Sequence, residues 1–294
     1  MTTHEGTINI SVIIPCYNAE TTIAATLESL ARQHWDQPWE VLVVDNRSTD
    51  RSLTIAAGYR ERLPSLRLID ASARQGQPFA LNVGVAAARG AKILLCDADD
   101  EVGPGWLQAM GAALSEHEFV AARIDNEKLN SGWVRQSRGN NQRDGLQPYR
   151  YPPFLPHASS GSLGFSRELY ERIGGFDESL LYLHDTDFCW RAQLAGVKLH
   201  FVADAVVHMR YRTTMRALWR QAYNYAIDNV LLYKRYRSKG MPPISPGMSL
   251  RAWWQLARRV VKVRGRGSLA ICLWYGAQRL GRLRGSLKYR VFAL

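Results

Sequence analysis

Three carboxylates follow a short apolar run near the middle of the chain. Residues 93–96 are apolar, and Asp97, Asp99 and Asp100 come directly after them, with only Ala98 between the first two. Carboxylates packed this closely repel one another unless a positive charge lies among them. Mg²⁺ and Mn²⁺ prefer oxygen ligands and are often shared with substrate phosphates. The run therefore predicts either a divalent-metal site or an acidic surface turn.

A second acidic cluster, His184-Asp185-Thr186-Asp187, precedes an amphipathic helix predicted over 187–194. A carboxylate at the start of a helix can serve only as a cap or as a partner of the helix dipole. It can also be a general base directed into a cleft. Both interpretations stay open at this point.

The first hundred residues alternate between buried strands and helices. We expect strands over 8–15, 40–44, 65–69 and 91–96, and helices over 19–33, from about 50 to 63, and over 78–89. This alternation predicts a mostly parallel, doubly wound sheet. The residues after the first strand contain no Gly-x-Gly-x-x-Gly fingerprint, and the chain has no P-loop, so two common nucleotide-binding folds are excluded.

Polar and aromatic side chains follow each of these strands. Tyr17, Asp45 and Arg74 follow the first three strands, and Asp97 and Asp99 follow the fourth. The carboxyl ends of parallel strands share one sheet edge, where ligands bind in open α/β sheets. An aromatic ring can stack on a base, a carboxylate can accept from a ribose hydroxyl, and an arginine can hold a diphosphate. Each residue alone also has a purely structural explanation.

The second half of the domain is predicted less sharply. We expect a helix and a short strand over 103–120, then a polar loop over 126–151 that is either a lid or a disordered insertion. The small residues of 158–165 predict a strand that lets a ligand approach closely. A short helix over 166–173 and strands over 197–202 and 205–207 follow, and the last strand leads into His208.

Charge is distributed unevenly along the chain. The 294 residues carry a net charge of +12 and are 46% hydrophobic, which is typical of a globular protein. Residues 249–294 contain 11 Lys and Arg and no Asp or Glu, which leaves 27 basic and 26 acidic residues elsewhere. The four scattered cysteines predict free thiols. We expect no signal peptide and no membrane span, and therefore a cytoplasmic protein that can bind peripherally to the inner face of a membrane.

The basic C-terminal segment predicts two helices, over 249–263 and 268–283. Trp253, Trp254 and Trp274 alternate there with arginines. Basic amphipathic helices with tryptophan suit an anionic membrane surface. A helical extension that packs on the domain, with a solvated basic face, explains the pattern equally well. We expect no nucleic-acid partner, because no nucleic-acid motif is present.

Several of these pieces occur together, in a consistent order, in one enzyme family. From about residue 8 to residue 235 the chain resembles the family 2 glycosyltransferases, which have the GT-A fold. The matching runs are Val-Ile-Ile-Pro-Cys-Tyr-Asn (12–18), Val-Val-Asp-Asn-Arg-Ser-Thr-Asp (43–50), Asp-Ala-Asp-Asp (97–100), Gly-Gly-Phe-Asp-Glu (174–178) and His-Asp-Thr-Asp-Phe-Cys-Trp-Arg (184–191).

The resemblance implies a set of donor-binding residues. The base and ribose of a UDP-, GDP- or dTDP-sugar would be held after the first two strands, and Arg74 would approach the diphosphate or the base. Asp97 and Asp99 match the family's Asp-x-Asp motif, with Asp99 as the direct ligand of Mn²⁺ or Mg²⁺. His208 is a further candidate ligand. The implied base and ribose contacts are Pro15, Tyr17, Asn18 and Asp45.

The resemblance also implies the catalytic side of the site. Asp185 matches the family's base, and a single displacement would invert the anomeric configuration. The family usually has Glu before this Asp, whereas this chain has His184. Asp187 is either a fallback base or a partner of Arg191. We place His184, Asp187, Gly161 and Ser162 around the acceptor, which would be a glycan or a lipid-linked molecule.

The prediction is therefore an α/β protein with a single GT-A domain, a mostly parallel Rossmann-like sheet flanked by helices, and a C-terminal helical extension. The expected divisions are a catalytic domain over 1–240 (a nucleotide-sugar half at 8–125, an acceptor half at 126–212 and a closing helix at 213–240) and a basic tail over 241–294. The expected activity is single-step, metal-dependent transfer in cell-surface glycan, glycolipid or polysaccharide assembly. Alternatives are a sugar nucleotidyltransferase or a non-catalytic sugar- or lipid-binding module anchored by the tail.

Overall fold

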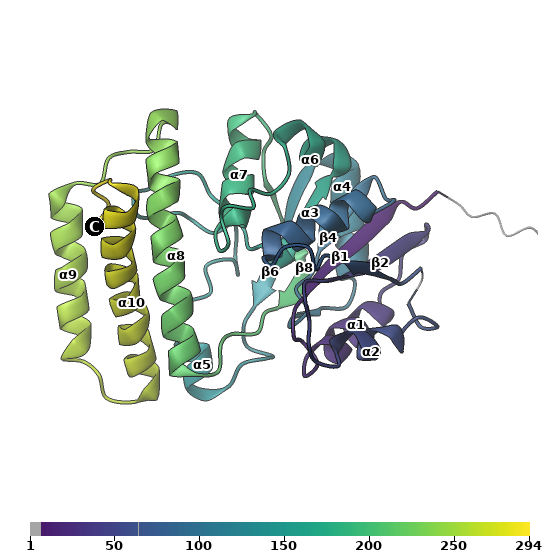
Figure 1. The fold of residues 1–294 in the computed structure, drawn as a ribbon, viewed down its shortest axis with the longest axis horizontal. Coiled ribbons are helices and arrows are strands. Elements are labelled where there is room, and N and C mark those ends of the chain that lie inside the picture. Colours follow the sequence, from purple (N-terminus) through teal and green to yellow (C-terminus); the bar gives the residue numbers. More distant parts are fainter. Residues whose placement is uncertain (1–6, 64) are drawn as a thin grey trace, which may run out of the picture. The chain divides into compact units, whose positions relative to one another are not determined.

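The computed structural model describes residues 7–63 and 65–294. Residues 1–6, on which the prediction about a signal peptide depends, lie outside the described residues. The chain divides into two compact units (Figure 1). The first unit contains the residues up to Asp125 together with Gln142–Gln147 and His157–Met209, and the second contains Asn126–Asn141, Pro148–Pro156 and Arg210–Leu294.

The first unit is built on an eight-stranded sheet in the order β3-β2-β1-β4-β7-β6-β8-β5. The pairs β1–β2, β1–β4, β2–β3 and β6–β8 are parallel, and β7 and β5 run antiparallel to their neighbours. The predicted mostly parallel α/β sheet is therefore confirmed. The strands are β1 (Ile10–Cys16), β2 (Trp39–Asp45), β3 (Arg67–Asp70), β4 (Lys92–Leu95), β5 (Glu101–Val102), β6 (Phe119–Asp125), β7 (Leu163–Ser166) and β8 (His200–His208).

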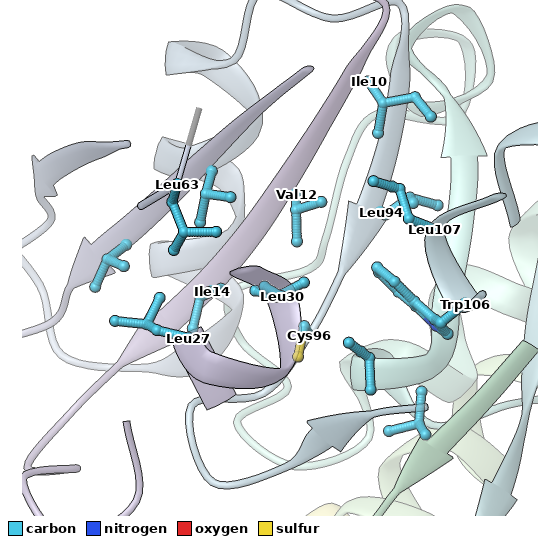
Figure 2. Packing of buried hydrophobic residues seen from close by; sticks show 14 of the residues in the cluster. Ile10, Val12, Ile14, Leu27, Leu30, Leu63, Leu94, Cys96, Trp106 and Leu107 are labelled. Atoms are coloured by element: carbon cyan, nitrogen blue, oxygen red, sulfur yellow. The ribbon is translucent and has the colours of Figure 1, made fainter. Parts of the chain in front are cut away.

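Helices cover both faces of this sheet. Val12 and Ile14 of β1 pack in one cluster with Leu27 and Leu30 of α1, together with side chains of α2 and α4 (Figure 2). Helix α3 packs on the opposite face, where a Cβ on Gly84 would lie only 2.6 Å from Ile13. The helices of this unit are α1 (Ile23–Ala31), α2 (Ser52–Ala57), α3 (Gln77–Ala87), α4 (Trp106–Glu116), α6 (Arg167–Ile173), α7 (His184–Leu194) and the 3₁₀ turn η1 (Ser160–Ser162).

Some elements differ from the sequence prediction. The strand expected over 158–165 is the turn η1 followed by β7, so Gly161 and Ser162 lie in a tight turn. Helix α7 begins at His184, three residues before the predicted start, which places Asp185 inside its first turn. The two strands expected near the end of the sheet form one strand, β8, because a bulge absorbs the polar interruption: Ala122 pairs with Val202, whereas Arg123 pairs with Val206.

The second unit is helical. It contains α5 (Gly132–Gln136), α8 (Met215–Tyr236), the 3₁₀ turn η2 (Arg237–Lys239), α9 (Pro246–Val260) and α10 (Arg266–Tyr289). Helix α10 lies between α8 and α9 (Figure 1). The two helices predicted in the basic tail are thus present. Among residues 7–63 and 65–294, no helix combines the length and the apolar character needed to cross a membrane.

The polar stretch predicted as a loop over 126–151 is more ordered than expected. Helix α5 forms near its start. Further along, Gln142 is fully buried, and its side-chain amide donates to the Ala122 carbonyl at 2.8 Å and to Ser162 Oγ at 2.7 Å. Hydrogen bonds thus allow Gln142 to be buried although its neighbours in the sequence are polar. The pattern of apolar residues cannot predict such a burial.

Candidate active site

The carboxyl ends of the parallel strands meet at one edge of the sheet, as predicted. The strand registers place Cys16 of β1 opposite Asp45 of β2, and Asp45 opposite Asp70 of β3. Strand β4 lies on the other side of β1, and the carboxylates of Asp97 and Asp99 follow it. The strand-end residues selected from the sequence therefore belong to one edge.

The three carboxylates after β4 are grouped closely enough to share a cation. Asp97, Asp99 and Asp100 each offer an oxygen, and these oxygens lie within 4.8 Å of one another. Asp100 is buried, and the other two are partly exposed. A compact set of carboxylate oxygens fits a hard divalent cation such as Mg²⁺ or Mn²⁺.

Two threonines, one just before α1 and one within it, hold the backbone of this acidic turn. Thr22 Oγ1 and Thr26 Oγ1 each lie 3.0 Å from the Ala98 carbonyl, and Thr26 Oγ1 lies 2.7 Å from the Asp100 carbonyl. Because the turn is bonded to α1, the carboxylates are directed by backbone geometry rather than by side-chain packing alone. The helical pattern of α1 did not single out these threonines.

The cysteines near this edge add no negative charge. Burial raises the pKa of the Cys96 thiol well above its usual range, and the charges of Asp100, Asp97 and Asp99 raise it further. Burial likewise raises the pKa of Cys16 to about 11, although hydrogen bonds from Ser52 and Ser48 oppose the shift. Both thiols stay protonated near neutral pH. All four cysteines are free, as predicted.

The loops after β1 and β2 are tied to each other. Asn18 Oδ1 accepts from the Thr49 backbone N–H at 2.8 Å, and the Asn18 N–H donates to Ser48 Oγ at 3.1 Å. Asp45 is buried and accepts from the Ser48 N–H at 3.1 Å. Pro15 lies at the end of β1, and the ring of Tyr17 is about half exposed, at 52%. Tyr17 can therefore contact a ligand, whereas the amide oxygen of Asn18 braces the loop.

Asn46 organises the loop that carries Arg74. Its side-chain Nδ2 donates to the carbonyls of Ala71 at 2.8 Å and Arg74 at 2.7 Å, and its Oδ1 accepts from the Gly76 N–H at 2.7 Å. Asn46 is only 4% exposed. Asn46 is not among the predicted site residues, because in the sequence it resembles its polar neighbours in a surface loop.

Replacing Asn46 with Ala is expected to raise the donor KM about tenfold with a smaller change in kcat and to lower the melting temperature. The loop bearing Arg74 loses three hydrogen bonds of about 1 kcal/mol each. A tenfold effect corresponds to about 1.4 kcal/mol of this in donor binding, and the rest is lost from folding stability. Steady-state kinetics and a melting curve measure the two effects. Asn46→Asp keeps the acceptor for Gly76 but loses both donors, so its effect should be intermediate. A donor KM unchanged in both variants contradicts the positioning role.

The guanidinium of Arg74 forms an ion pair with the carboxylate of Glu178. It also lies 5.4 Å from the centre of the Phe79 ring. Glu178 in turn accepts from Asn82 Nδ2 at 3.0 Å, which connects the loop after β3 to helix α3. Arg74 must exchange Glu178 for a diphosphate, or share it, in order to bind one.

The turn η1 brings the two acidic clusters together. The Ser160 N–H donates to Asp185 Oδ2 at 3.2 Å. On the other side of the turn, Gly161 lies so close to Asp97 that an added Cβ would be 2.9 Å from its Cγ and Oδ2. Gln77 Nε2 donates to Asp97 Oδ1 at 2.8 Å and lies 3.5 Å from Ser160 Oγ. One short turn thus contacts both Asp97 and Asp185.

The predicted residue Ser162 faces the interior. It is fully buried, donates from Oγ to the Ser159 carbonyl at 2.7 Å, and accepts from Gln142. It therefore shapes η1 from within. Gly161, its neighbour, is the residue of the predicted pair that touches a carboxylate of the site.

Gly161→Ala is expected to weaken Mn²⁺-dependent donor binding about tenfold or more, because the new methyl group must displace the Asp97 carboxylate. Isothermal titration of the donor with and without Mn²⁺ measures the effect. Gly139→Ala is a matched control, since a Cβ there meets only Asn141 Oδ1, at 3.8 Å. Equal affinities for the wild type and Gly161→Ala would show that Asp97 has room to move.

The polar residues in the first turn of α7 have different environments. His184 is buried, at 2% exposure. Burial lowers the pKa of His184, with the charges of Asp185 and Asp187 acting in the opposite direction. The ring packs edge-on against Phe176 at 5.8 Å. His184 is therefore a neutral packing residue behind the acidic cluster.

Asp187 has a structural partner. Its Oδ2 accepts from Arg191 Nε at 2.7 Å, and the same guanidinium donates to the carbonyls of Ile173 and Gly175 at 2.6 Å each. Of the two roles predicted for Asp187, the geometry supports the partner of Arg191. Asp185 is the carboxylate of α7 that faces η1.

His208 lies at the end of β8, and its Nδ1 is 2.6 Å from Asp125 Oδ2. It is outside the group of ligand atoms formed by the three aspartates after β4. A histidine whose Nδ1 is held by a carboxylate is oriented to use Nε2 toward a third group. Metal ligation by His208 stays a prediction.

Comparison with known proteins identifies the family. The Glycosyl transferase family 2 model matches residues 11–174, and the Glycosyl transferase family group 2 model matches residues 151–279. The uncharacterized glycosyltransferase YibD of Escherichia coli (strain K12) is 34% identical over 46% of this chain and 37% of its own length. The poly(ribitol-phosphate) beta-N-acetylglucosaminyltransferase TarS of Staphylococcus aureus is 35% identical over 44% of this chain and 23% of its own.

Solved structures agree on the fold. The mannosyltransferase PcManGT from Pyrobaculum calidifontis, in complex with GDP-Man and Mn²⁺, superimposes with a TM-score of 0.63 at 19% identity, covering 96% of this chain and 88% of that chain. TarS residues 1–349 in complex with UDP-GlcNAc superimpose with a TM-score of 0.54 at 19% identity, covering 98% and 93%. The match spans only 37% of the length of YibD and 23% of the length of TarS. The first family model alone covers more than half of the chain, which therefore belongs to glycosyl transferase family 2.

Proposed function

We propose that this chain transfers a sugar from a nucleotide-sugar donor to an acceptor hydroxyl, with metal dependence and inversion of the anomeric configuration. The observation that carries the proposal is the turn η1, which contacts Asp97 through Gly161 and Asp185 through Ser160. The turn thus lies between two carboxylates. Asp97, after β4, would serve the donor, and Asp185, in α7, would serve the acceptor.

The donor side would use the sheet edge. Tyr17 offers an exposed ring for stacking on a base, and Asp45 offers carboxylate oxygens to a base N–H or a ribose hydroxyl. Arg74 would bind the diphosphate or the base, because a guanidinium matches paired phosphate oxygens. The structures of PcManGT with GDP-Man and of TarS with UDP-GlcNAc support a nucleotide-sugar donor for this fold.

Asp97 and Asp99 would hold Mn²⁺ or Mg²⁺, with Asp99 as the direct ligand. The grouping of the three carboxylate oxygens supports this assignment, and so does the Mn²⁺ in the PcManGT complex. When bound, the ion would offset the negative charge that develops on the departing nucleoside diphosphate.

Asp185 would act as the base. The acceptor hydroxyl oxygen forms a bond to the anomeric carbon, the bond from that carbon to the diphosphate oxygen breaks, and the hydroxyl proton passes to the Asp185 carboxylate. The Ser160 N–H holds Oδ2 of this carboxylate, and the Thr186 N–H lies 2.7 Å from Oδ1. A single displacement of this kind inverts the anomeric centre.

The proposed setting is cytoplasmic assembly of a cell-surface glycan, glycolipid or polysaccharide. The acceptor would be a glycan or a lipid-linked molecule presented at the inner face of a membrane, and residues 249–294 would bind the anionic surface there. The excess of 11 basic over no acidic residues in this segment supports an anionic partner.

A thermal-shift panel of UDP-, GDP- and dTDP-sugars, with and without Mn²⁺, tests the donor assignment. We expect one nucleotide class to raise the melting temperature, and Mn²⁺ to enlarge the shift. NMR of the anomeric proton in the product of the stabilising donor then tests inversion. Stabilisation by no nucleotide sugar, or a product with retained configuration, contradicts the proposal.

A further inference from the structure

Helix α9 exposes its apolar face, which a helix packed on a protein surface normally buries. At 100° per residue, its apolar side chains at 250, 253, 254, 257, 260 and 261 fall on one face. A surface helix normally buries such a face. Here Leu250 is 71% exposed, Trp254 57% and Val261 83%, and Trp253 and Val260 are exposed as well.

The side of α9 that is covered is a different one. Only Ser249 is buried, and Met248, Ala252 and Leu256 are half-buried. At 100° per residue these four residues fall within one side of the helix, away from the apolar face, and α9 packs against α10. Helix α9 is therefore attached through a narrow side, whereas its widest apolar face is exposed to solvent.

Positive charge borders the exposed apolar face. Arg251, Arg258 and Lys262 follow one edge at helical spacing. The Arg258 guanidinium lies 4.5 Å from the centre of the Trp254 ring, which holds a charge directly beside the most prominent aromatic side chain. No acidic residue occurs after Asp228 in the sequence, so nothing in the extension offsets these charges.

We propose that α9 lies in the interface of an anionic lipid bilayer, with Leu250, Trp253, Trp254, Val260 and Val261 among the acyl chains and Arg251, Arg258 and Lys262 at the headgroups. An apolar face with tryptophan and a flanking basic edge is the pattern of an interfacial helix. A protein partner would have to present an apolar surface rimmed with carboxylates. A bilayer of anionic lipids supplies both an apolar interior and negatively charged headgroups beside it.

Helix α10 also exposes an apolar face. Leu269, Leu280, Leu283 and Leu287 recur on one side of α10 and are all exposed. Helix α10 packs on α8 through its small residues, where a Cβ on Gly281 would lie 2.3 Å from the Tyr223 carbonyl. Two neighbouring helices of one unit thus bury small residues and expose leucines. The membrane contact rests on the proposed function only for its purpose, which is to meet a lipid-linked acceptor.

Flotation of the full chain with vesicles of phosphatidylglycerol and phosphatidylcholine, or of phosphatidylcholine alone, tests the proposal. We expect binding to the anionic vesicles, weakened by salt. The triple variant Leu250→Ser, Trp254→Ser, Val261→Ser should bind them at least about tenfold more weakly. Leu194→Ser, which alters an exposed leucine of α7, is the matched control and should bind like the wild type.

A charge variant separates the two parts of the interaction. Arg251→Glu, Arg258→Glu, Lys262→Glu should lose about tenfold or more on anionic vesicles only. Arg60→Glu, at an exposed position of the first unit, should change nothing. Equal binding by the wild type and the apolar triple variant, or no binding to either vesicle, overturns the proposal. So does concentration-dependent self-association that the triple variant abolishes, because the face would then join copies of the chain.

Donor binding measured without lipid keeps this test separate from the proposed reaction. Thermal shifts with nucleotide sugars should be the same for the wild type and both triple variants. Vesicle binding by a chain that binds no nucleotide sugar would remove the proposed function and leave the membrane face intact. Donor binding without vesicle binding would leave the proposed transfer reaction intact and remove the membrane face.

Discussion

Asp185→Asn is expected to lower kcat by about 10²–10⁴-fold, the usual contribution of a general base, while the donor affinity stays within about twofold. The amide keeps the shape of the carboxylate and one acceptor oxygen for the Ser160 N–H, so η1 stays in place. It loses the ability to take the acceptor proton, together with the oxygen that accepts from the Thr186 N–H. Single-turnover transfer and donor titration measure the two quantities separately.

Two controls make this result specific. Asp204→Asn makes the same chemical change at an exposed position in the β8 bulge and should leave kcat unchanged. Asp187→Asn breaks the pair with Arg191 and should lower the melting temperature, with activity recovering at a lower assay temperature. Turnover of Asp185→Asn within a few fold of the wild type removes Asp185 as the base. Loss confined to Asp187→Asn, with a normal melting curve, transfers the role to that residue.

The sheet and its reactive edge could be predicted from the sequence for a physical reason. Strands β1, β2 and β4 are almost entirely buried and consist mostly of apolar residues, so the first polar residue after each of them marks the strand end. Asp45 and Asp97 could thus be placed at one edge without knowing the strand order. The parallel arrangement then puts both at the same edge of the sheet, with β1 between their strands.

The joint between the two acidic clusters could not be predicted in this way. Gly161 reaches Asp97, and Ser160 reaches Asp185, across 64 and 25 positions of sequence. A turn of small residues has no periodicity that reveals its partners, and the pattern over 158–165 was instead typical of a strand. Asn46 escaped notice for a related reason, because a buried amide with three hydrogen bonds looks in sequence like any polar loop residue.

The tail shows a different limit of pattern reasoning. Periodicity tells which side of a helix is apolar, but it does not tell whether that side is covered. The sequence of 249–263 therefore left packing and membrane binding equally open. The exposure of Leu250 and Trp254, beside a covered side made by Ser249 and Ala252, favours the membrane.

Asp99→Ala is expected to weaken Mn²⁺ binding by about 100-fold or more, because losing a direct carboxylate ligand should exceed the 10–100-fold cost typical of losing an outer partner. The carboxylate oxygens of Asp97, Asp99 and Asp100 lie within 4.8 Å of one another, so removing one opens the set on one side. Titration calorimetry with Mn²⁺ alone gives the affinity without requiring turnover. Chelation of the wild type with EDTA should remove the extra thermal shift that Mn²⁺ adds to the donor.

Asp36→Ala provides the matched control, since the Asp36 carboxylate is 90% exposed and lies 3.0 Å from His34 Nε2 on the surface. It should bind Mn²⁺ like the wild type. Asp99→Glu keeps the charge but lengthens the side chain, so its affinity should fall between those of the wild type and Asp99→Ala. Full Mn²⁺ affinity in Asp99→Ala would move the metal away from this residue.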